Sequence, residues 1–359
     1  MNKRVYVIAE AGVNHNGSLE LAKRLIDEAA NAGADAVKFQ TFKAERLVSR
    51  YAEKADYQKK LTGEQESQFD MIRKLELSKD DHGQLIRHCR ERGIEFLSTP
   101  FDDVSLELLV RQYGLRKIKI SSGDLTNLPL LLKAASMDCQ VILSTGMATL
   151  GEIEAALGAL AFGYLRPGER PSLQAFLRAY SLPEGQELLK QNVTLLHCTT
   201  EYPTPYQDVH LNKMVTLSRA FELPVGYSDH TLGTEVPVAA VALGACVIEK
   251  HFTLDKNMEG PDHQASLEPQ ELAAMIEQIR HLELALGSGR KCPAASELKN
   301  MTPVRKSIVA ARDIWKGETF DETNLTIKRP GNGLPPSLYW DMLGRTARRA
   351  YQKDELIEW

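Results

Sequence analysis

Eight short apolar segments, each followed by an amphipathic stretch, occupy the first 285 residues and limit the folds open to this chain. They lie at 5–10, 36–40, 95–101, 117–123, 141–146, 193–199, 225–230 and 246–252. The segments do not alternate between apolar and polar residues, so we expect strands buried on both faces, as in a parallel sheet with helical connections. Eight β–α units are the number that closes a barrel. A doubly wound open sheet is the alternative, but no G-x-G-x-x-G follows the first segment.

The chain is longer than a barrel alone requires, because it has 359 residues and one-domain α/β barrels run to roughly 250. We predict the barrel at 1–286, with an extended, irregular connection at 163–190. The Gly-, Ser-, Pro- and Lys-containing segment 287–302 is typical of a linker. Residues 303–359 carry a net charge of +2 against −6 for the rest, and all three tryptophans. They predict a small, turn-rich second domain with Trp315, Trp340 and Trp359 in its core.

Charge and composition exclude several classes of protein. The chain has 44 Lys and Arg against 48 Asp and Glu, which gives no signal for nucleic acid or an anionic membrane. No segment approaches the ~18 apolar residues of a membrane helix, and Glu10 interrupts the first apolar stretch, against a signal peptide. The five scattered cysteines contain no C-x-x-C, which disfavours a disulfide framework or structural zinc site. We expect a cytoplasmic protein.

Polar side chains end nearly every predicted strand. One such residue is usually only a helix cap, but all eight strands share the pattern. Because the carboxyl ends of barrel strands meet at one rim, we predict a composite active site there. The residues are Glu10, Lys38, Gln40, Thr99, Lys119, Ser121, Ser122, Ser144, Thr145, Thr199, Thr200, Ser228, Asp229, His230, Glu249, Lys250 and His251.

Two of these residues, Lys38 and Lys119, predict a site for a phosphorylated anion together with the hydroxyl groups on the same rim. Gly123 and Gly146 would let backbone amides approach the ligand. The alternative is that one lysine pairs with Glu10 or Glu249, which would still leave the other for the anion.

Two histidines end neighbouring strands and can converge on a metal ion. His230 and His251 are 21 residues apart, at the ends of the seventh and eighth apolar segments. Two imidazoles leave coordination positions for water and substrate oxygens, which favours an exchangeable divalent ion such as Mn²⁺ over a closed zinc site. For His15, in VNHNG, a loop-capping role is the better prediction.

The ordered motifs AEAGVNHNG, VKFQT, STPF, KISSGD, LSTGM, HCTTEYPTP, GYSDHTLG, EKHFTLDKNMEGPDH and KRPGNG cover essentially the whole chain. They resemble the sialic acid (N-acetylneuraminate) synthase family, which includes the legionaminate synthases. The resemblance implies a (β/α)8 TIM barrel followed by a small antifreeze-like (SAF) domain, in a domain-swapped homodimer.

The activity implied by the resemblance is condensation of phosphoenolpyruvate (PEP) with an acetamido sugar aldehyde, giving a nine-carbon α-keto acid and phosphate. The divalent ion would be Mn²⁺, with Mg²⁺ and Co²⁺ as alternatives, on His230 and His251. Glu10, Lys38 and Lys119 would be catalytic. PEP would be held by Lys38, Thr99, Lys119, Ser122, Ser144, Thr200 and Ser228. The sugar would be held by Gln40, Tyr202, Glu249, Asp262 and the partner's Arg329.

The sequence departs from the N-acetylmannosamine enzymes where substrate choice is expected to show. Thr200 stands where several relatives have Asn, and residues 55–75 do not match the segment that contacts the sugar's distal hydroxyls. Both features resemble the legionaminate branch, which takes 6-deoxy diacetamido sugars. The sequence leaves the choice open between N-acetylmannosamine and 2,4-diacetamido-2,4,6-trideoxymannose.

Two other functions remain open from the sequence. A Schiff-base aldolase would use Lys119 or Lys38 as nucleophile and pyruvate as substrate, without a metal. Alternatively, the tail would be a non-catalytic sugar-binding module carried on an inert barrel.

Overall fold

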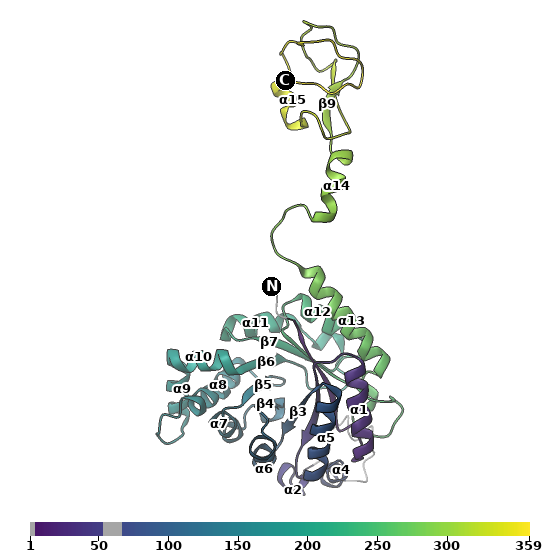
Figure 1. Ribbon diagram of the computed structural model, residues 1–359. Helices are drawn as coiled ribbons and strands as arrows, with labels where there is room; N and C mark the ends of the chain where they lie inside the picture. The colour runs from purple at the N-terminus through teal and green to yellow at the C-terminus, as the bar shows by residue number, and fades with distance from the viewer. Residues whose placement is uncertain (1–3, 53–66) are drawn as a thin grey trace. The chain divides into compact units, whose positions relative to one another are not determined.

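The computed structural model describes residues 4–52 and 67–359, and the chain divides into two units between Gly287 and Ser288 (Figure 1). Residues 55–66 of the predicted sugar-selective segment lie outside the described residues. None of the described helices is long and apolar enough to cross a membrane.

The first unit is built around parallel strands in the order β3-β2-β1-β8-β7-β6-β5-β4, and the terminal strands β3 and β4 also contact each other. The first strand, β1, pairs with the last, β8, and this pairing together with the contact of β3 and β4 confirms a nearly closed barrel over the open sheet. The strands are β1 (Tyr6–Gly12), β2 (Ala36–Thr41), β3 (Glu95–Pro100), β4 (Lys117–Ile120), β5 (Gln140–Ser144), β6 (Val193–His197), β7 (Val225–Asp229) and β8 (Val247–His251).

Helices surround the strands in Figure 1. Several begin at a side chain that caps free backbone amides, such as Ser18 before α1 and the Thr149–Glu152 capping box of α8. The helices are α1 (Leu19–Asn31), α2 (Ala44–Leu47), α4 (Gln68–Lys74), α5 (Lys79–Arg92), α6 (Asp103–Glu107), α7 (Leu128–Ser136), α8 (Leu150–Leu165), α9 (Leu173–Ser181), α10 (Pro183–Asn192), α11 (Asn212–Phe221), α12 (Glu235–Ala242) and α13 (Pro269–Leu286).

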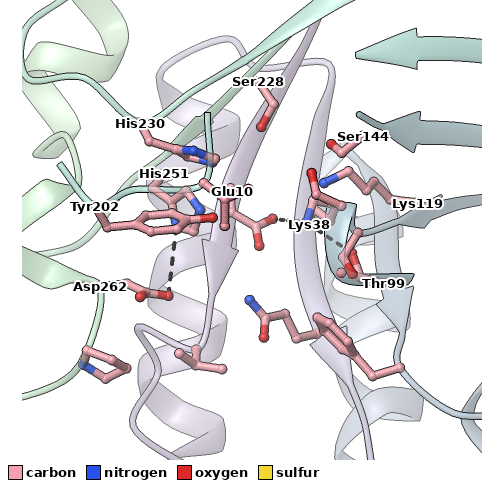
Figure 2. Close-up of a pocket in the computed structure, with 18 of the residues that line it drawn as sticks. Glu10, Lys38, Thr99, Lys119, Ser144, Tyr202, Ser228, His230, His251 and Asp262 are labelled. Atoms are coloured by element: carbon pink, nitrogen blue, oxygen red, sulfur yellow. Dashed lines mark hydrogen bonds and ion pairs between the residues drawn. The ribbon is translucent and has the colours of Figure 1, made fainter. Parts of the chain in front are cut away.

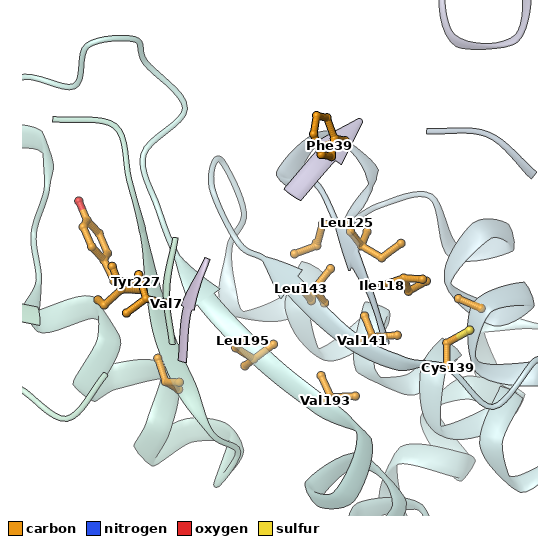
Figure 3. Packing of buried hydrophobic residues seen from close by; sticks show 14 of the residues in the cluster. Val7, Phe39, Ile118, Leu125, Cys139, Val141, Leu143, Val193, Leu195 and Tyr227 are labelled. Atoms are coloured by element: carbon orange, nitrogen blue, oxygen red, sulfur yellow. The ribbon is translucent and has the colours of Figure 1, made fainter. Parts of the chain in front are cut away.

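Each strand is buried on both faces, as its apolar sequence predicts. Outward-facing residues such as Val7 and Val141 pack against the helices in the main core (Figure 3). Ile8, Leu97 and Ile142 belong to a separate cluster that fills the inside of the barrel. Members of the two clusters are adjacent along β1, β2, β3, β5, β6 and β8, so a residue two positions after an inner one also faces inward.

The prediction of an extended, irregular connection at 163–190 is wrong. Helices α9 and α10 occupy most of it, because Ser172 caps α9 and Phe176 and Ala179 recur at helical spacing on its buried face. Gly158 permits the close approach of α8 to α9, since a Cβ at this position would lie 2.9 Å from the carbonyl oxygen of Phe176.

The second unit contains helices α14 (Ala295–Val304) and α15 (Tyr339–Met342) and an antiparallel pair, β9 (Ser307–Ala310) with β10 (Leu325–Lys328). Helix α14 falls largely within the predicted linker. The prediction that the tryptophans form this unit's core is wrong, because Trp315, Trp340 and Trp359 are 74%, 75% and 50% exposed. Smaller residues fill the core instead: Ile308, Ala310, Ile314, Phe320, Leu325, Met342, Ala347, Tyr351 and Ile357.

Candidate active site

The residues assigned to PEP, the sugar and the metal line one cavity at the carboxyl ends of the strands, with the exception of Arg329. Arg329 lies in the second unit, and its contact with the sugar stays a prediction. The cavity has a volume of about 420 Å³, and its lining includes Glu10, Lys38, Gln40, Thr99, Lys119, Ser122, Ser144, Thr200, Tyr202, Ser228, His230, Glu249, His251 and Asp262.

Strand alternation decides which strand-end residues reach this cavity. Ser228 and Glu249 line it, whereas their neighbours Asp229 and Lys250 do not. These neighbours form a fully buried ion pair instead, with the Lys250 Nζ 2.5 Å from an Asp229 carboxylate oxygen. They were predicted among the strand-end residues of the rim, but the period of two turns them toward the outside of the barrel.

Three other polar residues from the sequence analysis have local structural contacts. The hydroxyls of Thr145 and Thr199 donate to backbone carbonyls, each at 3.0 Å, and neither residue lines the cavity. The backbone amide of Gly17 donates to Nδ1 of His15 at 3.0 Å, which confirms the predicted loop-capping role of His15.

Two buried lysines and two buried glutamates form the charged centre of the cavity. The Nζ of Lys38 lies 2.6 Å from Glu10, 3.7 Å from Glu249 and 3.1 Å from the Thr99 hydroxyl. The Nζ of Lys119 lies 2.8 Å from Glu249. The pairing with Glu10 or Glu249 that the sequence left open as an alternative for one lysine is therefore found for both, and the Glu249 carboxylate serves both lysines.

The two glutamates have opposite protonation tendencies. Burial raises the pKa of Glu10 to about 7, against the opposing effect of Lys38. Burial alone would also raise the pKa of Glu249, but Lys119 and Lys38 hold it well below its usual range. Burial would lower the pKa of Lys119, but the nearby negative charges, first Glu249 and then Glu10, together raise it. Glu10 is therefore the carboxyl group suited to exchange a proton near neutral pH.

A cradle of hydroxyl groups lies beside the lysines. The hydroxyls of Ser144 and Thr200 are buried and have no hydrogen-bond partner among residues 4–52 and 67–359. Ser122 Oγ accepts a hydrogen bond from the Gly146 amide at 2.9 Å and lies 3.1 Å from the Cys198 sulfur. A Cβ at Gly146 would lie 2.5 Å from the Thr200 hydroxyl, so glycine keeps the cradle open. Positive charges and unsatisfied donors together suit an anion.

The histidines lie across the cavity from the lysines, with Glu10 between the two groups (Figure 2). The ring centroids of His230 and His251 are 5.5 Å apart. Burial lowers the pKa of His230 to about 4 and the pKa of His251 well below its usual value, so both are neutral, as metal ligands must be. Nδ1 of His230 lies 2.6 Å from the Thr199 carbonyl oxygen, which leaves Nε2 for a ligand.

Asp262 completes this side of the cavity. One of its oxygens lies 4.0 Å from Nδ1 of His251, a buried atom for which the described residues provide no hydrogen-bond partner. Burial raises the pKa of Asp262 to about 6. The described part of the chain holds no cluster of three or more His, Cys, Asp or Glu ligands. The donor set therefore fits an ion whose remaining ligands are water and substrate oxygens.

Sequence reasoning missed an apolar wall of the same cavity. We define it as Phe42, Leu47, Met71, Ile72 and Leu75, which come from α2, α4 and their flanking turns. These residues follow the ends of the strands rather than lying in them, so the pattern of polar strand ends does not reveal them. The signal in the sequence is the departure at residues 55–75 from the segment that contacts the sugar's distal hydroxyls, and α4 lies within these residues.

The comparisons with known proteins agree with this architecture. The NeuB family model matches residues 25–291, and the SAF domain model matches residues 305–359. The N,N'-diacetyllegionaminic acid synthase of Campylobacter jejuni is 54% identical over 355 residues, covering 99% of each chain. The enzyme of the same name from Legionella pneumophila is 46% identical, covering 94% of this chain and 89% of its own length.

A solved structure supports the same relationship. The N-acetylneuraminic acid synthetase of Leptospira borgpetersenii, in complex with citrate, is 35% identical and superposes with a TM-score of 0.66, covering 83% of this chain and 90% of that one. The family models span most of the chain, and the relatives match it nearly end to end. This chain therefore belongs to the NeuB family and carries a C-terminal SAF domain.

Proposed function

We propose that the cavity condenses PEP with the open-chain aldehyde of 2,4-diacetamido-2,4,6-trideoxymannose, giving N,N'-diacetyllegionaminate and phosphate. The observation that carries the proposal is the division of one cavity into an anion cradle and a histidine pair, with Glu10 between them (Figure 2). The names of the two legionaminic acid synthases at 54% and 46% identity support the choice of sugar over N-acetylmannosamine.

The anion cradle suits PEP, which carries a phosphate and a carboxylate. Lys38 and Lys119 would neutralise its charge, and the unsatisfied hydroxyls of Ser144 and Thr200 would donate to its oxygens. We assign Thr99, Ser122 and Ser228 to the same group. Binding would fix the enol C3 toward the centre of the cavity, and an oriented pair of reactants lowers the entropic cost of bond formation.

The histidine side would receive the sugar. His230 and His251 would hold the divalent ion, for which we propose Mn²⁺ over Mg²⁺ or Co²⁺, and the bound ion would polarise the aldehyde carbonyl. Tyr202 contacts the His230 ring, with centroids 4.2 Å apart, and Tyr202 with Asp262 would orient the sugar's hydroxyl groups. We assign Gln40 and Glu249 to the sugar as well.

Glu10 lies where the new bond would form. Attack by C3 of PEP on the aldehyde carbon makes the C–C bond and breaks the carbonyl π bond, so that the aldehyde oxygen gains a proton and becomes a hydroxyl group while positive charge is left at C2 of PEP. The Glu10 carboxylate would stabilise that charge and then take a proton from the water that adds to C2. Cleavage of the bond between C2 and the phosphate oxygen would release phosphate and leave the α-keto acid.

The aldolase alternative requires an uncharged lysine, which this cavity does not favour. Burial would lower the pKa of Lys119, but Glu249 and Glu10 together raise it, and a nucleophilic lysine needs a lowered pKa. A phosphate-release assay with PEP and each sugar tests the proposal. Pyruvate-dependent activity that survives EDTA and is trapped by borohydride would favour the aldolase instead.

We further propose that the second domain, 303–359, covers the cavity of a partner chain in a domain-swapped homodimer, and that the barrel ends at 286 before a linker at 287–302. Exposed apolar residues on the loops at the carboxyl ends of the strands support such a cover: Met147, Leu150, Tyr206 and Leu232.

Arg329 would then reach the N-acyl group of the sugar. Arg329→Ala is expected to raise the KM for the sugar with little change for PEP. If both constants stay unchanged, Arg329 has no place in the site and the tail is a separate binding module.

The scattered cysteines support a cytoplasmic location for this reaction.

A further inference from the structure

The cavity has two surfaces of different chemistry. Its polar residues, apart from Gln68 on α4, come from the strands and the turns at their ends, and these hold the assigned positions for PEP and the aldehyde. The apolar wall comes from α2, α4 and their flanking turns, which follow strand β2 along the chain and therefore lie beyond its carboxyl end. A sugar whose aldehyde points to the histidines would extend outward, and the carbons farthest from the aldehyde would then lie against this wall, which lines the same cavity.

The apolar wall is a built feature held by specific contacts. One Glu76 oxygen accepts from the Ala44 amide at the start of α2, at 2.6 Å, and the other lies 3.0 Å from the Lys43 Nζ. The end of α4 rests on Gly17, where a Cβ would lie 2.4 Å from the carbonyl oxygen of Lys74. Gly17 also has a φ of +75°, which favours glycine.

The wall presents aliphatic and aromatic side chains to the ligand. Phe42 and Met71 are almost fully buried, and Leu47, Ile72 and Leu75 are half-buried around the cavity. None of these five side chains can form a strong hydrogen bond. A hydroxyl placed against them loses its water partners and gains none, whereas a methyl group gains apolar contact.

We propose that the apolar wall selects the sugar by the substituents far from its aldehyde, accepting a C6 methyl group and disfavouring a C6 hydroxyl. The inference rests on the proposed function, because it assumes that the sugar aldehyde lies at the histidines. It assigns Ile72 and Leu75 as specificity-determining residues. An apolar pocket rejects an added hydroxyl by roughly 10²-fold in kcat/KM, and this is the preference expected of the unmodified enzyme.

A pair of variants with nearly the same shape tests the wall. Ile72→Val and Ile72→Thr differ by one hydroxyl in place of one methyl. Phosphate release is measured for both with 2,4-diacetamido-2,4,6-trideoxymannose and with N-acetylmannosamine. The ratio of the two kcat/KM values is expected to be about tenfold lower for Thr than for Val. Leu75→Asn provides a second variant with the same expected direction, and Leu284→Gln, 82% exposed on α13, is the control that leaves the ratio unchanged.

The outcomes separate this inference from the proposed function. If the unmodified enzyme releases phosphate with the deoxy sugar but Ile72→Thr, Ile72→Val and Leu75→Asn share its ratio, the wall does not select the sugar and this inference alone fails. If the unmodified enzyme releases no phosphate with either sugar, the proposed function fails, and the inference fails with it.

Discussion

Replacing Glu249 by glutamine would remove one buried negative charge from between two lysines. The Glu249 side chain is 2% exposed, and its Oε1 accepts from the Lys119 Nζ and the Ser228 hydroxyl, each at 2.8 Å. Its Oε2 lies 3.7 Å from the Lys38 Nζ. The carboxylate therefore holds three groups assigned to PEP, in addition to the sugar contact proposed for it.

The size of the effect follows from these distances. At an effective dielectric constant of about 20, the attraction is about 6 kcal/mol to Lys119 and about 4 kcal/mol to Lys38. The desolvation of three buried ions offsets most of it, and removing one partner of a buried pair costs roughly 3–5 kcal/mol. Glu10 would compensate in part, because loss of Glu249 lowers its pKa and favours its ionised form. We expect a loss of about 3 kcal/mol in the free energy of unfolding.

Thermal unfolding with and without PEP measures the prediction. Without PEP the melting temperature of Glu249→Gln is expected to fall by roughly 5 °C, because the unfolding entropy is about 2.1 cal/mol/K for each residue of the first unit. Saturating PEP replaces the missing negative charge, so it is expected to raise the melting temperature more in this variant than in the unmodified protein. Glu277→Gln, on the surface of α13 with its side chain 71% exposed, is the matched control. An equal PEP shift in all three proteins would refute the reasoning and leave Glu249 with a role toward the sugar only.

Three further predictions concern residues at or near the site. Glu10→Gln is expected to bind PEP and sugar but lower kcat by ~10²-fold or more, and near-normal turnover would remove Glu10 from the mechanism. His230→Ala and His251→Ala should each lose bound Mn²⁺, measured by elemental analysis, while the circular dichroism spectrum is unchanged; full metal retention would contradict the assignment. Burial lowers the pKa of His15 to about 4, from a value of 6.5 in the unfolded chain. Below pH 6.5 the unfolded chain therefore binds a proton at His15 that the folded protein does not, and the free energy of unfolding decreases as the pH falls toward 4. His15→Asn should therefore reduce the loss in urea stability between pH 7 and 5 by about 2 kcal/mol, and an identical pH profile would show that His15 does not titrate on unfolding.

The charged centre shows how much of the site can be predicted from the sequence. The strand-end pattern names Lys38, Lys119, Glu10 and Glu249, but it does not say which carboxylate belongs to which lysine. In the barrel Glu249 lies beside both lysines, because closure brings β8 next to β1 and places the interior faces of β2 and β4 within reach. The resulting difference in pKa between Glu10 and Glu249 depends on their burial and on their distances from the lysines, and a short motif determines neither.

The sequence by itself determined the number of strands, their parallel arrangement and the chemistry at their ends, because apolar segments of this length and spacing have few ways to bury both faces. It did not separate Ser228 from Asp229 or Glu249 from Lys250, since strands buried on both faces lack the polar alternation that marks inside from outside. Only the tertiary structure decided those orientations and the apolar wall. Ile72 belongs to α4 and Leu75 directly follows it, and their place in the cavity depends on the packing of α2 and α4 at the barrel rim.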